Sequence, residues 1–219
     1  MASKRLILAS ASPRRRELLS RLVRSFDVIP SGAPEVHSPE LAPDQAAAGV
    51  ALAKALTVLH EHPDAVVLGA DTVVHRTGGD GFVLYGKPAD REDAKRMLAE
   101  LSGAMHFVST GIAVVWHGRA GELRGRIEAV TTGVWFRPLT APEIAAYVAT
   151  DEPLDKAGAY GIQEGAAAFV ERIEGDYFNV VGLSLAAVRR LLRGLLPDLG
   201  PVPPLPHLPF RVSKLSPRA

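Results

Sequence analysis

Residues 6–19 read LILASASPRRRELL, and the order of elements at the start of the chain follows from this stretch. The apolar run Leu6–Ala9 is long enough for a buried β-strand. Ser12 is typical of a helix N-cap, and Pro13 suits the first helical position, where its missing N–H group costs no hydrogen bond. The stretch therefore predicts a strand that is followed at once by a helix.

The charge at the start of this helix is unusual. A helix N-terminus carries the positive end of the macrodipole and favours acidic residues, yet Arg14, Arg15 and Arg16 occupy its first turn. One interpretation is a solvated basic helix start at which Ser12 serves only as a cap. The combination of free N–H groups, guanidinium groups and the hydroxyls of Ser10 and Ser12 instead favours an anion site, most naturally for a polyphosphate.

Length and composition limit the class of protein. The chain has 219 residues, 47% of them hydrophobic, which suffices for one domain or for two small lobes that share a cleft. The net charge of +1 argues against a broad surface for nucleic acid. The absence of cysteine excludes disulfides, thiolate metal sites and a cysteine nucleophile. Because no apolar run approaches the ~18 residues that span a bilayer, we expect a cytoplasmic protein with no membrane partner.

Further along the chain, apolar runs alternate with helical patterns, which predicts an α/β fold with a mixed sheet. The expected strands are residues 6–9, 26–30, 65–68, 82–85, 105–116, 123–136, 166–173 and 177–181. The expected helices begin at residues 13, 43, 91, 141 and 185. Residues 1–196 form the predicted domain, and residues 197–219 form a proline-rich tail that we expect to be extended or disordered.

Asp71 is the strongest acid candidate, because it directly follows the apolar run Val66–Ala70. An unpaired carboxylate buried there would be costly. Such a group usually accepts a proton from water or holds a divalent cation. The alternative is a turn aspartate that bonds to its own backbone. Since the apolar run resumes at Val73, we favour the functional interpretation.

Three more charged residues are candidates for the site only in combination with Asp71. Glu35 lies in a proline-rich loop and is an ordinary solvated residue unless it shares a metal with Asp71. Lys54 is on an alanine-rich helix, where lysines are usually exposed, whereas Lys87 stands between Gly and Pro at a strand end. A cationic set of Arg14, Arg15, Lys54 and Lys87 facing the two carboxylates has the balance that phosphoryl chemistry requires.

Several motifs then point to a family. They are residues 8–15 (LASASPRR), 68–74 (LGADTVV), 86–88 (GKP), 101–103 (LSG), 150–163 (TDEPLDKAGAYGIQ) and, more weakly, 180–183 (VVGL). On these residues the chain resembles the Maf family of nucleoside triphosphate pyrophosphatases from Leu6 to Leu195. The resemblance implies a mixed, elongated α/β sheet flanked by helices, with two lobes around a cleft as in the Maf and ITPase folds.

The resemblance also implies an activity. It is hydrolysis of a nucleoside triphosphate to monophosphate and pyrophosphate with Mg²⁺ or Mn²⁺, which Glu35 and Asp71 would hold. Asp71 falls on the proton acceptor of the family, and Lys54 and Lys87 would assist it. Arg14, Thr72 and Gln163 fall on positions associated with base choice, and Ser10, Ser12 and Arg15 would complete the substrate site.

Thr72 and Gln163 are similar to those of the subgroup that acts on dTTP and UTP, and a glutamine amide offers a pyrimidine both a donor and an acceptor. Hydrolysis of 7-methyl-GTP, or a nucleotide-binding role in regulating cell division, are the alternatives. A homodimer is compatible with the sequence.

Overall fold

The computed structural model describes residues 4–79, 81–196 and 211–212. These residues divide into two compact units. The first unit contains residues 4–72, 110–130 and 182–196, and the second contains residues 73–109, 131–181 and 211–212. The chain passes between the units inside three long strands, β3 (Val66–Gly78), β5 (Met105–His117) and β6 (Leu123–Phe136).

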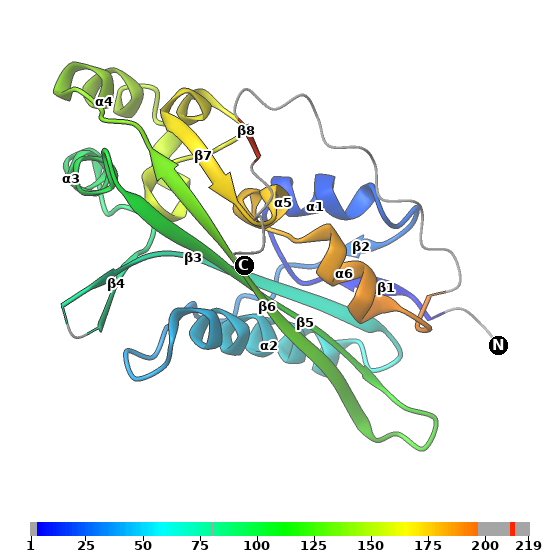
Figure 1. Cartoon of the computed structure of the whole chain (residues 1–219). Helices are drawn as coiled ribbons and strands as arrows, with labels where there is room; N and C mark the ends of the chain where they lie inside the picture. The colour runs from blue at the N-terminus through cyan, green and yellow to red at the C-terminus, as the bar shows by residue number, and fades with distance from the viewer. Residues whose placement is uncertain (1–3, 80, 197–210, 213–219) are drawn as a thin grey trace, which may run out of the picture. The chain divides into compact units, whose positions relative to one another are not determined.

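In the first unit, strands run in the order β2-β1-β3-β5-β6. Strand β1 (Leu6–Leu8) pairs in parallel with β2 (Asp27–Val28) on one side and with β3 on the other. Helices α1 (Pro13–Ser20) and α6 (Leu185–Leu192) lie on one face, and α2 (Pro43–Glu61) lies on the other (Figure 1). The predicted strand–helix start is confirmed, because the Ser12 side chain accepts from the backbone N–H of Arg15.

Helix α2 contacts the sheet at two points with no side chain between them. Alanines of its buried face, among them Ala47, Ala51 and Ala55, lie at these points, and larger residues such as Val58 and Leu59 fill the core nearby. A Cβ atom added at Gly69 of β3 would lie 2.2 Å from Ala51 O, and one at Gly111 of β5 would lie 2.3 Å from the carbonyl carbon of Ala47. The helix backbone therefore rests directly on the glycine positions of two strands, which fixes the height of α2 above the sheet.

In the second unit, strands run in the order β4-β3-β5-β6-β7-β8. Strand β4 (Gly81–Tyr85) pairs antiparallel with β3, β7 (Val170–Glu174) pairs antiparallel with β6, and β8 (Arg211–Val212) pairs in parallel with β7. The sheet thus mixes parallel and antiparallel ladders, and the predicted α/β class is confirmed.

The helices of the second unit begin where capping residues predict. Asp90 caps α3 (Arg91–Leu101) by accepting from Asp93 N, and Thr140 with Glu143 forms a capping box at α4 (Ala141–Val148). Short 3₁₀ turns follow at Glu152–Asp155, Ala157–Ala159 and Gly165–Phe169.

Fully buried His106 lies against Tyr160, with 2.8 Å between Nε2 and the hydroxyl, and burial lowers the pKa of His106 to about 3.

The strand expected at residues 166–173 is confirmed from Val170 on, as β7, but the strand expected at residues 177–181 is wrong. Tyr177–Val181 forms helix α5, and the segment before Val170 is a 3₁₀ turn. The cause is Asp176, whose Oδ1 accepts from the backbone N–H of Phe178 at 2.8 Å and of Asn179 at 3.3 Å, as an N-cap does. The run resembles a strand because it is rich in aromatic residues and valine, yet the cap decides its conformation.

Of the predicted proline-rich tail, residues 197–210 and 213–219 lie outside the described residues. Within the part of the chain that the structure covers, no helix is long and apolar enough to cross a membrane.

The close contact between α2 and the sheet gives a stability test. Gly69→Ala should lower the free energy of unfolding by about 2–3 kcal/mol, because its methyl group has no space against Ala51. Gly49→Ala on the exposed side of α2 is the matched control and should raise it by about 0.5–1 kcal/mol, since nothing lies within 4 Å of its Cβ position. Urea unfolding measures both, and equal effects would contradict the packing described above.

Candidate active site

Asp71 lies within the continuous strand β3, so the turn interpretation is wrong. Only 4% of the residue is exposed, and both carboxylate oxygens have partners. Lys54 Nζ lies 2.7 Å from Oδ1, and His37 Nε2 lies 2.7 Å from Oδ2. The acid is therefore buried, compensated in charge and held in one orientation.

Lys54 joins the two predicted carboxylates. From α2 its ammonium group donates to Asp71 and, at 2.7 Å, to Glu35 Oε1. The usual expectation of an exposed lysine on an alanine-rich helix is wrong here, because the residue is only 5% exposed. The Glu35 side chain is 45% exposed, so this acid reaches the cluster from the solvent side.

The surroundings of Asp71 keep it ionised. Burial by itself would raise the pKa of the carboxyl group, but the hydrogen bond from His37 and the positive charge of Lys54 outweigh burial. The net result is a pKa below the ordinary value for aspartate. At neutral pH the group is a carboxylate that is able to accept a proton.

Sequence reasoning missed the role of His37. The residue lies in the same loop as Glu35, in a segment without helix or strand, so no periodic pattern marks it. The only signal available was its distance of two residues from Glu35 in the sequence. The fold brings that loop against the strand that carries Asp71.

Arg15 ties together the chain segments around this acid. Its guanidinium group donates to Ala70 O at 2.8 Å, Thr72 Oγ1 at 3.0 Å and Gly182 O at 3.0 Å. A longer contact of 3.4 Å reaches Ser10 Oγ, and burial lowers the pKa of Arg15. Thr72 in turn shares a hydrogen bond of 2.9 Å with Thr110. Arg15 therefore links α1 to β3 and to the segment before α6.

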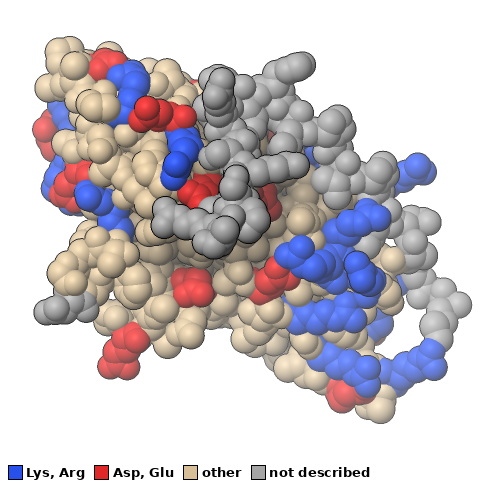
Figure 2. All heavy atoms as spheres, viewed as in Figure 1, with Lys and Arg blue, Asp and Glu red and all other residues tan. Residues whose placement is uncertain are grey.

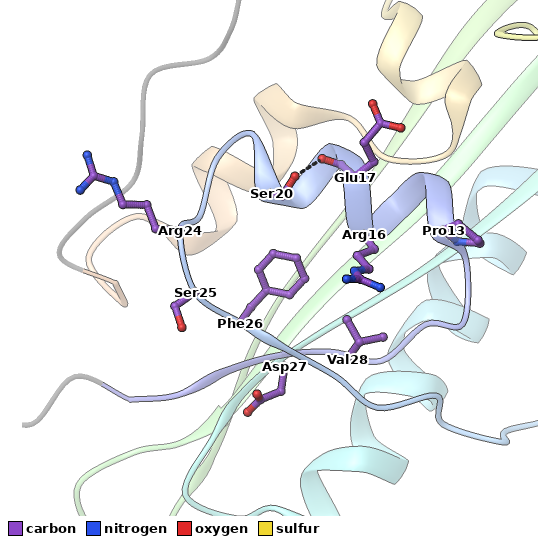
Figure 3. Close-up of a pocket in the computed structure, with 9 residues that line it drawn as sticks. All are labelled: Pro13, Arg16, Glu17, Ser20, Arg24, Ser25, Phe26, Asp27 and Val28. Carbon is purple, nitrogen blue, oxygen red and sulfur yellow. Dashed lines mark hydrogen bonds between the residues drawn. The ribbon is translucent and has the colours of Figure 1, made fainter.

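The three arginines of α1 face different surroundings. Arg14 is half-buried and adds positive charge close to Arg15. Arg16 lines a separate cavity of about 780 Å³ between α1 and β2, in which it extends toward Val28 beside Phe26 (Figure 3). None of the predicted site residues lines that cavity. The basic run thus divides between two sides of the helix.

Lysine and arginine also gather over α6 and the ends of β5 and β6 (Figure 2). Arg126 donates to Leu191 O at 2.7 Å and Arg193 O at 2.8 Å, and so satisfies carbonyl groups at the end of α6. Arg190 pairs with Glu128. These contacts give the arginines a structural role, and none of the predicted site residues belongs to this cluster.

Lys87 and Gln163 belong to the second unit. Lys87 is exposed directly after β4, where Gly86 O accepts from Gly158 N at 3.0 Å. Gln163 is exposed on a turn that follows the same segment. Within this unit, the strand end that carries Lys87 therefore lies against the segment that leads to Gln163.

The bonds of Arg15 give a second stability test. Arg15→Lys should lower the free energy of unfolding by roughly 2–3 kcal/mol, because one ammonium group cannot reach all three acceptors on the two chain segments. Arg16→Lys, on the exposed side of the same helix, should change it by less than about 0.5 kcal/mol. A thermal or urea melt that gave the two variants equal stability would show that Arg15 does not link these segments.

The sequence is similar to those of several named proteins. The chain is 51% identical over 188 residues to the dTTP/UTP pyrophosphatase of Gloeobacter violaceus, covering 86% of this chain and 94% of that protein. It is 52% identical over 188 residues to the dTTP/UTP pyrophosphatase of Moorella thermoacetica, covering 86% and 93%. Among solved structures, the Ham1 protein of Staphylococcus aureus matches 76% of this chain and 91% of its own, at 14% identity and a TM-score of 0.40. A family model described as Maf-like protein matches residues 5–195, and the chain therefore belongs to the Maf family.

Proposed function

We propose that the protein hydrolyses dTTP and UTP between the α and β phosphates and releases the monophosphate and pyrophosphate. The observation that carries this proposal is the buried, ionised carboxylate of Asp71, which accepts a hydrogen bond from Lys54. The chain is also about half identical to proteins named dTTP/UTP pyrophosphatase. Related pyrimidine triphosphates fall within the same substrate class.

Asp71 is the group that accepts a proton from the attacking water. A carboxylate offers about four lone-pair sites, so its bonds to Lys54 and His37 leave acceptor capacity for a water molecule. Its lowered pKa keeps the group deprotonated at neutral pH, which is the form that a proton acceptor needs. Lys54 and His37 fix the direction in which the remaining lone pairs point.

The cations bind the triphosphate and stabilise the charge that develops on it. Arg14 at the first turn of α1, with Lys54 and Lys87, supplies positive charge, and Ser10 and Ser12 supply hydroxyl groups. Arg15 contributes its charge while its donors hold Ala70, Thr72 and Gly182. Thr72, Arg14 and Gln163 select the base.

A divalent cation, Mg²⁺ or Mn²⁺, would be held by Glu35 and Asp71. The residues fit such an ion, because both carboxylates already approach one positive group, the Lys54 ammonium, within 2.7 Å. Among the described residues no cluster of three or more His, Cys, Asp or Glu side chains could hold a metal, so water and phosphate oxygens would supply the remaining ligands. When bound, the cation would neutralise phosphate charge.

Asp71→Asn tests the proposed base. The amide keeps the size of the side chain but loses the proton-accepting charge, so kcat should fall by about 10²–10⁴-fold while KM changes little. Asp64→Asn, an exposed acid just before β3, is the control and should leave both unchanged. Pyrophosphate release from dTTP and UTP measures the effect, and an unchanged kcat in Asp71→Asn would remove Asp71 from the mechanism.

The substrate class is tested by a panel of nucleotides with the unaltered protein. Pyrophosphate release should be highest with dTTP and UTP and should be lost when EDTA removes divalent cations. Preference for 7-methyl-GTP would move the protein to another subgroup of the family. Nucleotide binding without any pyrophosphate release would favour the regulatory alternative.

A further inference from the structure

Gln163 lies on a short turn whose geometry is set by its neighbours. Glu164 N donates to Gly161 O at 3.1 Å, which closes the turn around Ile162 and Gln163. Ile162 is 3% exposed and anchors the turn in the core of the second unit, while Gln163 is exposed. The side chain that would read the base therefore projects from a fixed backbone.

Tyr147 of α4 holds the first end of this turn. Its hydroxyl accepts from Gly161 N at 3.1 Å and donates to Glu152 Oε1 at 2.7 Å. The second oxygen of Glu152 accepts from Gly165 N at 3.2 Å, just beyond the turn. Burial and the bond to Glu152 raise the pKa of Tyr147, so the hydroxyl stays protonated and serves both partners.

Lys156 holds the second end of the Gln163 turn, at Glu164. Its ammonium group donates to Glu152 O at 2.6 Å, Asp155 Oδ1 at 2.8 Å and Glu164 Oε2 at 2.9 Å, which uses all three of its protons. Only 6% of the residue is exposed. A lysine buried to this degree would be costly without these partners.

The stem of Lys156 also fills the space below the turn. A Cβ atom at Gly161 would lie 2.6 Å from Lys156 Cε and 2.9 Å from Cδ. Gly161 therefore allows the aliphatic part of the lysine to contact the turn backbone, while the charged end binds Glu164. Packing and charge together leave the turn little freedom to move.

From this arrangement we infer that Tyr147 and Lys156 are positioning residues for base selection, which they exert by fixing the turn that carries Gln163. The inference rests on the proposed function, in which Gln163 contacts the base. Uracil offers a donor at N3 and an acceptor at O4, whereas cytosine offers an acceptor and a donor at these places. One amide tells them apart only when it approaches from a fixed direction. Both positioning residues lie in the unit that does not contain Asp71.

The experiment compares kcat/KM for UTP and CTP in Tyr147→Phe and Lys156→Met. Each variant keeps the packing of its side chain and loses the polar group. The preference for UTP over CTP should fall about tenfold in each, mainly through a higher KM for UTP. Tyr177→Phe, at a buried tyrosine of α5, and Lys95→Met, at a partly exposed lysine of α3, are the controls and should keep the preference.

A double-mutant cycle with Gln163→Ala separates positioning from general destabilisation. If Tyr147 and Lys156 act through Gln163, their substitution should not lower the preference further in the Gln163→Ala background. An unchanged preference in both folded single variants would overturn the inference, as would an equal further loss in that background. Both results leave the proposed function intact. No pyrophosphate release from UTP by the unaltered protein would instead overturn the proposed function, and this inference with it.

Discussion

A buried ammonium group shared by two carboxylates is the interaction on which the first unit depends. Lys54 lies between Asp71 and Glu35, and losing one partner of a buried pair leaves an uncompensated charge that costs about 3–5 kcal/mol. The lysine reaches the carboxylates because α2 rests on Gly69 and Gly111 without intervening side chains. The ion pair between Lys54 and Asp71 therefore depends on the small residues at these two contacts. Bulkier side chains there would move Lys54 away from the strand.

The two units contain polar networks of different kinds. The first holds a charged cluster whose members lower the pKa of Asp71 and keep it ionised. The second holds a network around the Gln163 turn, in which a tyrosine hydroxyl and a buried lysine bind backbone amides and acidic side chains. Charge suits the phosphates, which every nucleoside triphosphate shares, whereas fixed hydrogen-bond direction suits the base, which differs among them.

Local signals in the sequence predicted much of the fold, and those signals are the ones that the structure confirms. Ser12, Asp90 and Thr140 mark helix starts because a cap needs only its neighbours. The strand in place of α5 was predicted because a largely apolar run of five residues suits either state, and the decisive cap at Asp176 was overlooked. The burial of Lys54 and the role of His37 depend on contacts between distant segments, which no local pattern encodes.

The link between Arg15 and Gly182 also bears on the order in which the protein folds. The first unit is assembled from residues 4–72, 110–130 and 182–196, so its last segment is synthesised long after its first. A nascent chain that has not yet reached Gly182 lacks both α6 and the carbonyl that Arg15 binds. Closure of such a distant contact is slow compared with local helix formation. The first unit is therefore completed only after residues 182–196 have emerged from the ribosome.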